Sequence, residues 1–340
     1  MTRGESGHDG GYPDLDTGDQ VELLRGVALE AAGAYGLDVA ALTLVLHGFN
    51  TTFRVDTTDG RTLALRVNTN SLSTPEHVAA QQAWVHAIAS ETDVLVPDAV
   101  AARSGERLVI VPCAALGGSA LVVVNTWLEG PDVGRCGPVE AHALGRAMAT
   151  LHRQALGWTV PVGAELPVFD EPLFGDTDVI PRSELTTADS ELLAEAFDRS
   201  REAVSAVSAA SPAIAIHADL HGGNLKHHEG RLAVFDFDDS GVGVPAIDLA
   251  VATFYLREGR SDAESALRSG YAAVASLPDL PPVVFEGVVA ARQLLLANSL
   301  FATTTAQWRG EAEEYLGTTI ARLRHWLDTG RFTRDDQSSG

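Results

Sequence analysis

The chain has few cysteines, a single lysine and no long apolar run. Its two cysteines, Cys113 and Cys136, form no Cys-x-x-Cys pair and no Cys/His cluster, which excludes a disulfide framework and a cysteine-based metal site. No stretch of 18 uninterrupted apolar residues occurs, and the Gly/Asp-rich start lacks the apolar segment of a signal peptide. We therefore expect a cytoplasmic protein with no membrane partner.

Basic residues are scarce as well. The chain has 24 Lys and Arg against 46 Asp and Glu, a formal net charge of −22, and Lys226 is its only lysine. This charge disfavours a nucleic acid or an anionic membrane surface as a partner and attracts a small cationic molecule. The alternative is that the negative charge serves only to keep the protein soluble. The oligomeric state cannot be read from the composition.

Apolar residues, in contrast, make up 45% of the 340 residues, which is enough for two lobes with a sizeable core. The first part of the chain is rich in β-forming runs, with Asp59-Gly60 as a hairpin turn, and the part after Gly130-Pro131 has helical periodicity. Strands are expected over 42–46, 52–57, 62–67, 94–101, 108–111 and 121–128. Helices are expected over 21–35, 73–89, 139–152, 187–207, 245–256, 261–276, 283–303 and 309–328.

This order of elements predicts an α+β, bilobal fold with an antiparallel-sheet N-lobe and a mainly helical C-lobe. The N-lobe is expected to span 19–126 and the C-lobe 127–332, with disordered tails at 1–18 and 333–340. The internal helix of the N-lobe carries an inward stripe that includes Gln81 where a leucine would be usual.

Residues 213–239 carry the clearest chemical signal. Two apolar strand-like runs, 213–216 and 232–235, are followed by Asp219 and Asp236, and Asn224 lies five residues after Asp219. We expect the two runs to be adjacent strands. Asp219 could accept a proton from a substrate hydroxyl, and Asn224 and Asp236 offer the oxygen ligands that Mg²⁺ prefers. Each carboxylate alone could equally be a turn residue, but the three together favour phosphoryl transfer.

Two histidines of this segment allow a second interpretation. His217, Asp219 and His221 resemble the His-x-Asp-x-His cluster of a metal hydrolase, although a zinc site needs three protein ligands with an open position. We favour the interpretation that His217 is a packed scaffold residue that holds the loop.

The same residues resemble a known family. The pattern His217-Ala-Asp219, Asn224 and Phe235-Asp236 is similar to the catalytic loop and metal-binding segment of the aminoglycoside phosphotransferase, choline kinase and homoserine kinase-like family, which has a protein-kinase-like fold. The resemblance extends over about residues 40–325. It includes 48–55, similar to the family's nucleotide-covering hairpin; 123–130, similar to its interlobe hinge; and 243–250, where Asp248 matches the aspartate that braces the catalytic loop.

The resemblance implies an ATP- and Mg²⁺-dependent kinase that phosphorylates a hydroxyl of a small, amine-bearing molecule such as an aminoglycoside, an amino alcohol or a homoserine-like compound. It implies that Asp219 is the catalytic base, that Asn224 and Asp236 are metal ligands, and that His217 and Asp248 give structural support. Residues implied in cofactor binding are Gly48, Asn50, Arg66, Gln81, Asn125 and Trp127.

The chain departs from the family at the phosphate-binding pair. Arg66 stands where a lysine is usual and Gln81 where its glutamate partner is usual, and no Gly-x-Gly-x-x-Gly loop is present. Arginine is a planar fork and not a point charge, so this replacement changes the geometry of phosphate binding. Two alternatives therefore stay open, a protein Ser/Thr kinase of the same fold and a nucleotide-binding pseudokinase.

Overall fold

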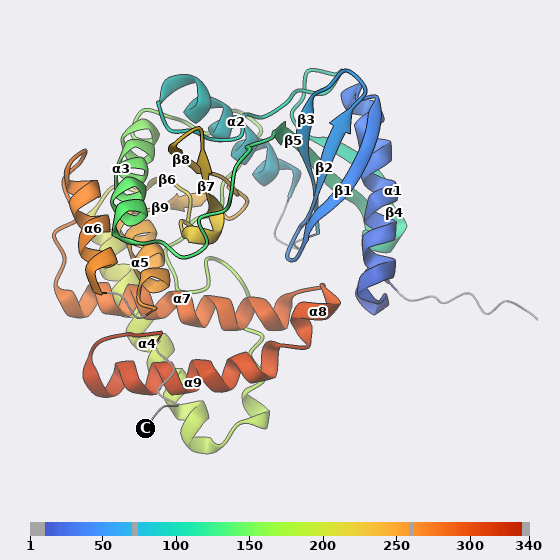
Figure 1. Cartoon of the computed structure of the whole chain (residues 1–340). Helices are drawn as coiled ribbons and strands as arrows, with labels where there is room; N and C mark the ends of the chain where they lie inside the picture. The colour runs from blue at the N-terminus through green and yellow to red at the C-terminus, as the bar shows by residue number, and fades with distance from the viewer. Residues whose placement is uncertain (1–10, 70–73, 259–260, 335–340) are drawn as a thin grey trace, which may run out of the picture. The chain divides into compact units, whose positions relative to one another are not determined.

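The computed structural model describes residues 11–69, 74–258 and 261–334, which form two compact units (Figure 1). Unit 1 contains the described residues up to Pro75 together with Ala99–Trp127 and Thr303–Glu311. Unit 2 contains Glu76–Asp98, Leu128–Ala302 and the described residues from Ala312 onward. The chain therefore crosses between the units more often than a single boundary at residue 126 would predict.

Unit 1 is an antiparallel sheet with one long helix. Its strands lie in the order β1-β2-β3-β5-β4, and Gly60, in the predicted turn between β2 and β3, has the left-handed φ of 86° that such turns need. The elements of this unit are α1 (Thr17–Tyr35), β1 (Val39–His47), β2 (Thr51–Thr57), β3 (Thr62–Asn68), β4 (Val109–Cys113), β5 (Gly118–Thr126) and α8 (Ala306–Arg309).

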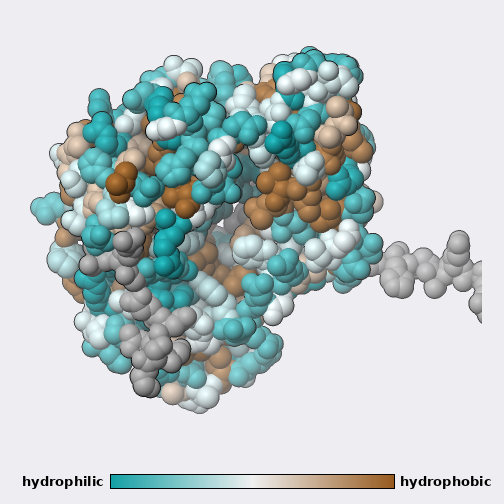
Figure 2. Space-filling view, viewed as in Figure 1, coloured by the Kyte–Doolittle hydropathy of each residue, from teal (hydrophilic) through white to brown (hydrophobic). Residues whose placement is uncertain are grey.

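One face of this sheet packs against α1. Alternate residues of β2 and β3, among them Phe53, Val55 and Leu65, are buried with Leu24 and Val27 of the helix. The opposite face of the sheet carries polar side chains such as Arg54, Arg66 and Asn125 together with the buried Leu121 and Val123. The edge strand β1 exposes Leu44, Val45 and Leu46, and Figure 2 shows apolar side chains gathered on this unit.

Of the tail predicted over 1–18, residues 1–10 lie outside the described residues, and residues 11–18 differ from the prediction. Residues 11–18 are ordered, since Asp16 caps α1 by accepting a hydrogen bond from Asp19 N and the ring of Tyr12 is buried in the core. The side chain of Gln20 donates to the backbone oxygen of Tyr12 at 3.0 Å and fixes this segment. A single buried aromatic residue thus orders a stretch whose composition alone is typical of disorder.

Unit 2 is mainly helical and contains two small sheets. β6 pairs with β9, and β7 pairs with β8, both antiparallel. The elements are α2 (Pro75–Glu91), α3 (Pro138–Ala155), α4 (Thr187–Ala210), β6 (Ile214–Ile216), β7 (Leu225–His228), β8 (Arg231–Val234), β9 (Gly241–Gly243), α5 (Pro245–Leu256), α6 (Ser261–Ala272), α7 (Pro282–Ala302) and α9 (Ala312–Thr329).

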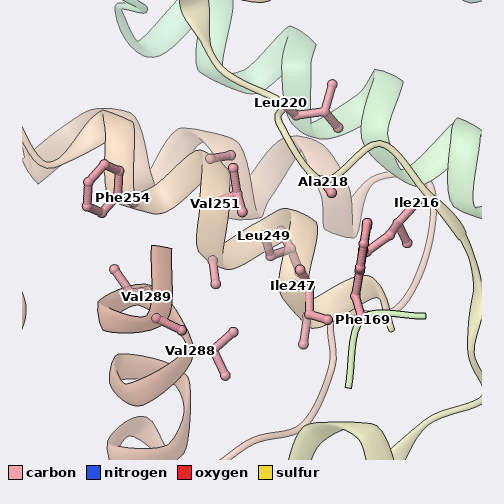
Figure 3. Close-up of a cluster of buried hydrophobic side chains, with 14 of the residues drawn as sticks. Phe169, Ile216, Ala218, Leu220, Ile247, Leu249, Val251, Phe254, Val288 and Val289 are labelled. Atoms are coloured by element: carbon pink, nitrogen blue, oxygen red, sulfur yellow. The ribbon is translucent and has the colours of Figure 1, made fainter. Parts of the chain in front are cut away.

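The core of unit 2 surrounds α5, which is buried along most of its length. Figure 3 shows Leu249 and Val251 of α5 near Val288 of α7, with Ala218 and Leu220 of the loop after β6 in the same apolar cluster. α7 is long and apolar enough to cross a membrane by length and composition, but 67% of its most apolar 18-residue stretch is buried inside the protein, as in a core helix. The loop that carries Asp219 is therefore anchored in the core on both sides of that residue.

Three sequence predictions differ from the structure. The run 94–101 is not a strand, since it makes only isolated bridges at Leu95 and Ala99 and contains Pro97, which has no N–H to donate. The runs 213–216 and 232–235 are not partners of each other, because β6 pairs with β9 and β8 pairs with β7. The internal helix α2 packs with unit 2, where Trp84 and Ile88 join the larger core.

The C-terminal region extends further than predicted. Phe332 is buried and stacks on Phe254 with 5.4 Å between ring centroids, and Arg334, assigned to the tail by sequence, forms an ion pair with Glu258. The predicted α+β fold, with one part built on an antiparallel sheet and another that is mainly helical, is confirmed.

Candidate active site

The loop that follows β6 is held in a strained shape by one buried carboxylate. Ala218 has a left-handed φ of 63°, a backbone conformation that costs free energy in a residue other than glycine. The carboxylate of Asp248 in α5 accepts hydrogen bonds from the backbone N–H of Ala218 at 2.6 Å and of His217 at 3.2 Å. These charge-assisted bonds offset the strain and fix the direction in which Asp219 leaves the loop.

Asp248 is itself held by a buried polar chain. The ring of His152 in α3 donates from Nε2 to Asp248 Oδ2 at 2.9 Å, and its Nδ1 accepts from the hydroxyl of Tyr271 in α6 at 2.9 Å. Because all three side chains are buried, each polar atom in this chain needs its partner. The structure thus places Asp248 where its predicted supporting role requires it.

His217 also supports the loop. Its ring is fully buried, its Nε2 donates to the backbone oxygen of Phe235 at 3.1 Å, and its Nδ1 accepts from the backbone N–H of Asp219 at 3.3 Å. Burial lowers the pKa of His217, which favours the neutral ring that these two bonds require. The bond to Phe235 ties the catalytic loop to the end of β8, directly before Asp236.

The carboxylate of Asp219 is contacted on both oxygens. Its Oδ2 accepts from the side-chain nitrogen of Asn224 at 2.8 Å and lies 3.4 Å from Nε2 of His221. Its Oδ1 accepts a hydrogen bond from the guanidinium of Arg292 in α7. Burial alone would raise the pKa of Asp219, but the charges of Arg292 and His221 outweigh it and hold this pKa well below its usual value. Asp219 is therefore ionised, as a proton acceptor must be.

Asn224 and Asp236 lie at the same end of the β7–β8 hairpin. Leu225 and Val234 face each other across this hairpin, and Asn224 precedes the first while Asp236 follows two residues after the second. The side-chain nitrogen of Asn224 is used by Asp219, so its oxygen is the atom left for a cation. One amide oxygen and one carboxylate fit Mg²⁺, which takes one or two protein ligands and completes its shell with water and phosphate oxygens.

The metal-hydrolase interpretation of His217 and His221 is not supported by the positions of these rings. His217 is buried in loop contacts, and His221 stacks on Tyr255 with 4.1 Å between ring centroids while its Nδ1 accepts from Gly223 N. Among the described residues, no group of three or more His, Cys, Asp or Glu is arranged to hold a metal ion. Zinc sites need such a set.

A cavity of about 380 Å³ lies within unit 2, and His221 of its wall contacts Asp219. Its wall includes His221 and Gly222 of the catalytic loop, Tyr255 and Glu258 at the end of α5, and Arg334. Arg135 also lines it and lies 3.4 Å from Glu258. Because His221 both lines this cavity and contacts Asp219, the cavity ends near the carboxylate. Its charged side chains could bind a small molecule with polar groups.

The predicted cofactor residues of unit 1 gather on the sheet face away from α1. Ala64 of β3 faces Asn125 of β5 in the sheet register, so Arg66 and Asn125 share one face because side chains alternate along a strand, and Trp127 follows directly after the end of β5. Asn125 Oδ1 accepts no hydrogen bond from the described residues. Arg54 joins this face, with its guanidinium 5.4 Å from the ring centroid of Trp127. Arg54 was not identified from the sequence.

The predicted nucleotide loop at 48–50 is supported by a segment far away in the sequence. The hydroxyl of Thr305 donates to the backbone oxygen of Gly48, and the ring of Trp308 packs on Phe49 with 5.0 Å between centroids. Asn50 Oδ1 accepts from the backbone N–H of Thr69 at 3.0 Å. Residues 303–311 therefore shape the loop between β1 and β2, which the sequence did not indicate.

Gln81 contacts the segment that follows Asp236. Its side-chain nitrogen donates to the backbone oxygen of Asp238, and it lies 2.8 Å from Nε2 of His77. His77 is also 2.9 Å from the backbone oxygen of Ser240. The pair of α2 side chains thus holds the backbone after Asp236, a role that differs from the predicted contact with the cofactor.

Sequence reasoning missed Arg292 and Tyr255. Tyr255 contacts both His221 and Arg292, and burial raises its pKa to about 12. A signal for Arg292 was present, since a charged residue in the middle of the mainly apolar helix at 283–303 is seldom buried without a partner. The sequence did not indicate which partner it has.

Comparison with known proteins places this geometry in a family. The sequence pattern of the phosphotransferase enzyme family matches residues 42–283, most of the chain. An uncharacterized protein of Deinococcus radiodurans is 29% identical over 244 residues, which cover 71% of this chain and 68% of that protein.

Two solved structures share the fold. A microcompartment-associated aminopropanol kinase is 24% identical with a TM-score of 0.71, covering 92% of this chain and 100% of that one. The amicoumacin kinase hAmiN, solved in complex with AMP-PNP, Ca²⁺ and Ami, is 18% identical with a TM-score of 0.71, covering 87% of this chain and 93% of that one. The predicted kinase-like fold class is confirmed. The chain belongs to the phosphotransferase enzyme family, which also confirms the predicted class of enzyme.

Proposed function

We propose that this protein is an ATP- and Mg²⁺-dependent kinase that phosphorylates a hydroxyl group of a small molecule. The observation that carries the proposal is the position of the Asp219 carboxylate, which is fixed by Asn224 and Arg292 and contacts His221 in the wall of a cavity of small-molecule size. A carboxylate in this position can accept the proton of an acceptor hydroxyl as the oxygen attacks the γ-phosphate.

The other residues have separate tasks in this proposal. The oxygens of Asn224 and Asp236 would hold Mg²⁺, which when bound neutralises charge on the phosphate oxygens. Asp248 and His217 keep the loop in its strained shape. Arg66 and Asn125, on the polar face of the sheet in unit 1, remain the predicted contacts of the nucleotide.

For the acceptor, we propose an amine-bearing alcohol. The net charge of −22 favours a cation at a distance, and the structures that share this fold include an aminopropanol kinase and an amicoumacin kinase. In the cavity, the carboxylate of Glu258 already pairs with Arg135 through one oxygen and with Arg334 through the other, so the amine would share it with these arginines. Arg135 and Arg334 lie on either side of Glu258 and would suit an acid group. Among aminoglycosides, amino alcohols and homoserine-like compounds, these arginines favour the last class, which carries both groups.

The test is ATP turnover with matched pairs of acceptors. Homoserine and 3-amino-1-propanol differ only in the carboxylate, and spectinomycin represents the antibiotics. We expect turnover that requires Mg²⁺ and is lost roughly 10²–10⁴-fold in Asp219→Ala. A wild-type protein no more active than Asp219→Ala on every acceptor would refute the proposal.

Two further outcomes select the alternatives. Phosphate transfer to proteins of a lysate, with no small molecule phosphorylated, would indicate a protein kinase. Nucleotide binding measured by calorimetry, without any turnover, would indicate a pseudokinase.

A further inference from the structure

Arg292 is a buried cation at the catalytic carboxylate. It lies in the middle of α7 among apolar residues, only 5% of its surface is exposed, and its Nη2 donates to Asp219 Oδ1. Burial by itself would lower the pKa of Arg292, but Tyr255 and Asp219 outweigh it and raise this pKa. A charged side chain pays a large desolvation cost in such a place, so its partner must compensate for that cost.

The guanidinium is fixed from a second side by Tyr255. The Tyr255 hydroxyl lies 3.0 Å from Arg292 Nη2, and the ring centroid is 5.6 Å from the guanidinium carbon. The same ring stacks on His221 at 23° between planes, and His221 Nε2 faces Asp219 Oδ2 at 3.4 Å. Arg292, Tyr255 and His221 therefore form a closed set of contacts around Asp219.

The two oxygens of the Asp219 carboxylate are contacted from two different parts of unit 2. Arg292 of α7 holds Oδ1, and Asn224 of the catalytic loop holds Oδ2. An ionised carboxylate has about four acceptor positions, and His221 Nε2 also lies at Oδ2, so Oδ1 keeps a lone pair for another donor. With contacts on both oxygens, rotation of the carboxylate is prevented while one position on Oδ1 is left for an acceptor hydroxyl.

We propose that Arg292 is a positioning residue for phosphoryl transfer, which holds the Asp219 carboxylate in the orientation that an acceptor hydroxyl must meet. This inference rests on the proposed function. A displacement of about 1 Å of a reacting group can cost roughly 10²-fold in rate. The competing interpretation is that Arg292 occupies the carboxylate and blocks it until a substrate displaces the guanidinium.

Steady-state kinetics of matched arginine variants distinguish the positioning role of Arg292 from the blocking role. Arg292→Gln removes the charge and the fork, and Arg292→Lys keeps the charge. Arg257→Lys is the control, since Arg257 is equally buried and ion-paired, but with Glu264 and Glu286. With the best acceptor of the panel, we expect kcat to fall about 10²-fold in Arg292→Gln with KM for ATP within about twofold of wild type. Arg292→Lys should recover part of the loss, and Arg257→Lys should keep the wild-type kcat.

An unchanged kcat in Arg292→Gln would overturn the inference, and a raised kcat would show that Arg292 blocks the base. A wild-type protein without turnover refutes the proposed function, and then a measurement that needs no substrate tests the pair. Unfolding by urea is compared for Asp219→Asn, Arg292→Gln and the double variant. We expect the double variant to be more stable than the sum of the single losses predicts, because it leaves no unpaired buried charge. Additive losses would show that the two side chains do not act as a pair.

Discussion

The side-chain nitrogen of Asn224 lies 2.8 Å from Asp219 Oδ2 and 2.9 Å from the backbone oxygen of the same residue. Both donor positions of the amide are thus used on one neighbour, which fixes the amide plane and leaves its oxygen to point elsewhere. Asp219, the proposed base, and Asn224, the proposed metal ligand, therefore hold each other in place. A substitution of either residue should affect both proton transfer and the Mg²⁺ requirement.

Replacing Asn224 by alanine should raise the Mg²⁺ concentration needed for half-maximal activity by at least about tenfold, together with a loss in kcat. The reason is that the variant lacks both the cation ligand and the donor to Asp219. Mg²⁺ titrations of ATP turnover measure this. Asn298→Ala is the control, because Asn298 is also a buried amide but bonds to Thr177 and Val179. An Asn224→Ala enzyme with the wild-type Mg²⁺ curve would exclude Asn224 as a ligand.

Asp248→Asn should destabilise the protein and the loop together. The amide would present N–H to a site that now receives three donors, and hydrogen bonds to a charged group contribute about 1.5–3 kcal/mol each. We expect a loss of at least about 1.5 kcal/mol in the free energy of unfolding measured with urea. Tyr271→Phe removes a neutral bond at the far end of the chain and should cost less. A larger loss of unfolding free energy in Tyr271→Phe than in Asp248→Asn would contradict this prediction.

The residues identified from the sequence are those close together along the chain. Asp219, Asn224 and Asp236 follow a local pattern, in which residue type and spacing are enough to suggest a shared task. Arg292 lies 73 residues from Asp219, and only the packing of α7 against the core brings them together. The sequence shows that a charge interrupts an apolar helix but not where that charge points.

The same limit applies to the small sheets. β6 and β9 have three residues each, so hydrophobic pattern cannot decide whether β6 pairs with residues 241–243 or with 231–234. The longer strands β2, β3 and β5 were predicted within a few residues, since their alternation and the Asp59-Gly60 turn specify them locally.

A close helix contact predicts the effect of two glycine substitutions. A Cβ atom on Gly145 of α3 would lie 2.1 Å from the backbone oxygen of Leu267 in α6, whereas one on Gly26 of α1 would meet nothing within 4 Å. Gly145→Ala should therefore lower the free energy of unfolding by about 1–3 kcal/mol through overpacking. Gly26→Ala should raise it by about 0.5–1 kcal/mol, since alanine favours the helix. If both variants changed the free energy of unfolding in urea by the same amount, α3 and α6 would be able to move apart to make room for the added methyl group.

The two cysteines should differ in reactivity. Burial raises the pKa of the Cys136 thiol to about 11, so at pH 8 only roughly one thiol in a thousand is ionised. Cys113 is half-exposed at the end of β4. A disulfide reagent at pH 8 should modify Cys113 quickly and Cys136, which is buried but lines the cavity of unit 2, much more slowly, and the Cys113→Ser variant should show no fast phase. A fast phase that persists in Cys113→Ser would mean that Cys136 is accessible.

The contact between Trp308 and Phe49 predicts an effect on nucleotide binding. Trp308 packs on the loop proposed to cover the nucleotide, and an aromatic pair contributes about 0.5–1.5 kcal/mol beyond its buried area. If this contact keeps the loop in its binding shape, Trp308→Ala should raise KM for ATP up to about tenfold. The KM for the acceptor should stay close to that of the wild type, because Trp308 belongs to unit 1 and the acceptor cavity to unit 2.

Steady-state kinetics with each substrate varied in turn separates the KM for ATP from the KM for the acceptor. Trp308→Phe keeps an aromatic ring and should retain most of the affinity for ATP, whereas equal rises in both constants would show that the loop does not act on the nucleotide alone.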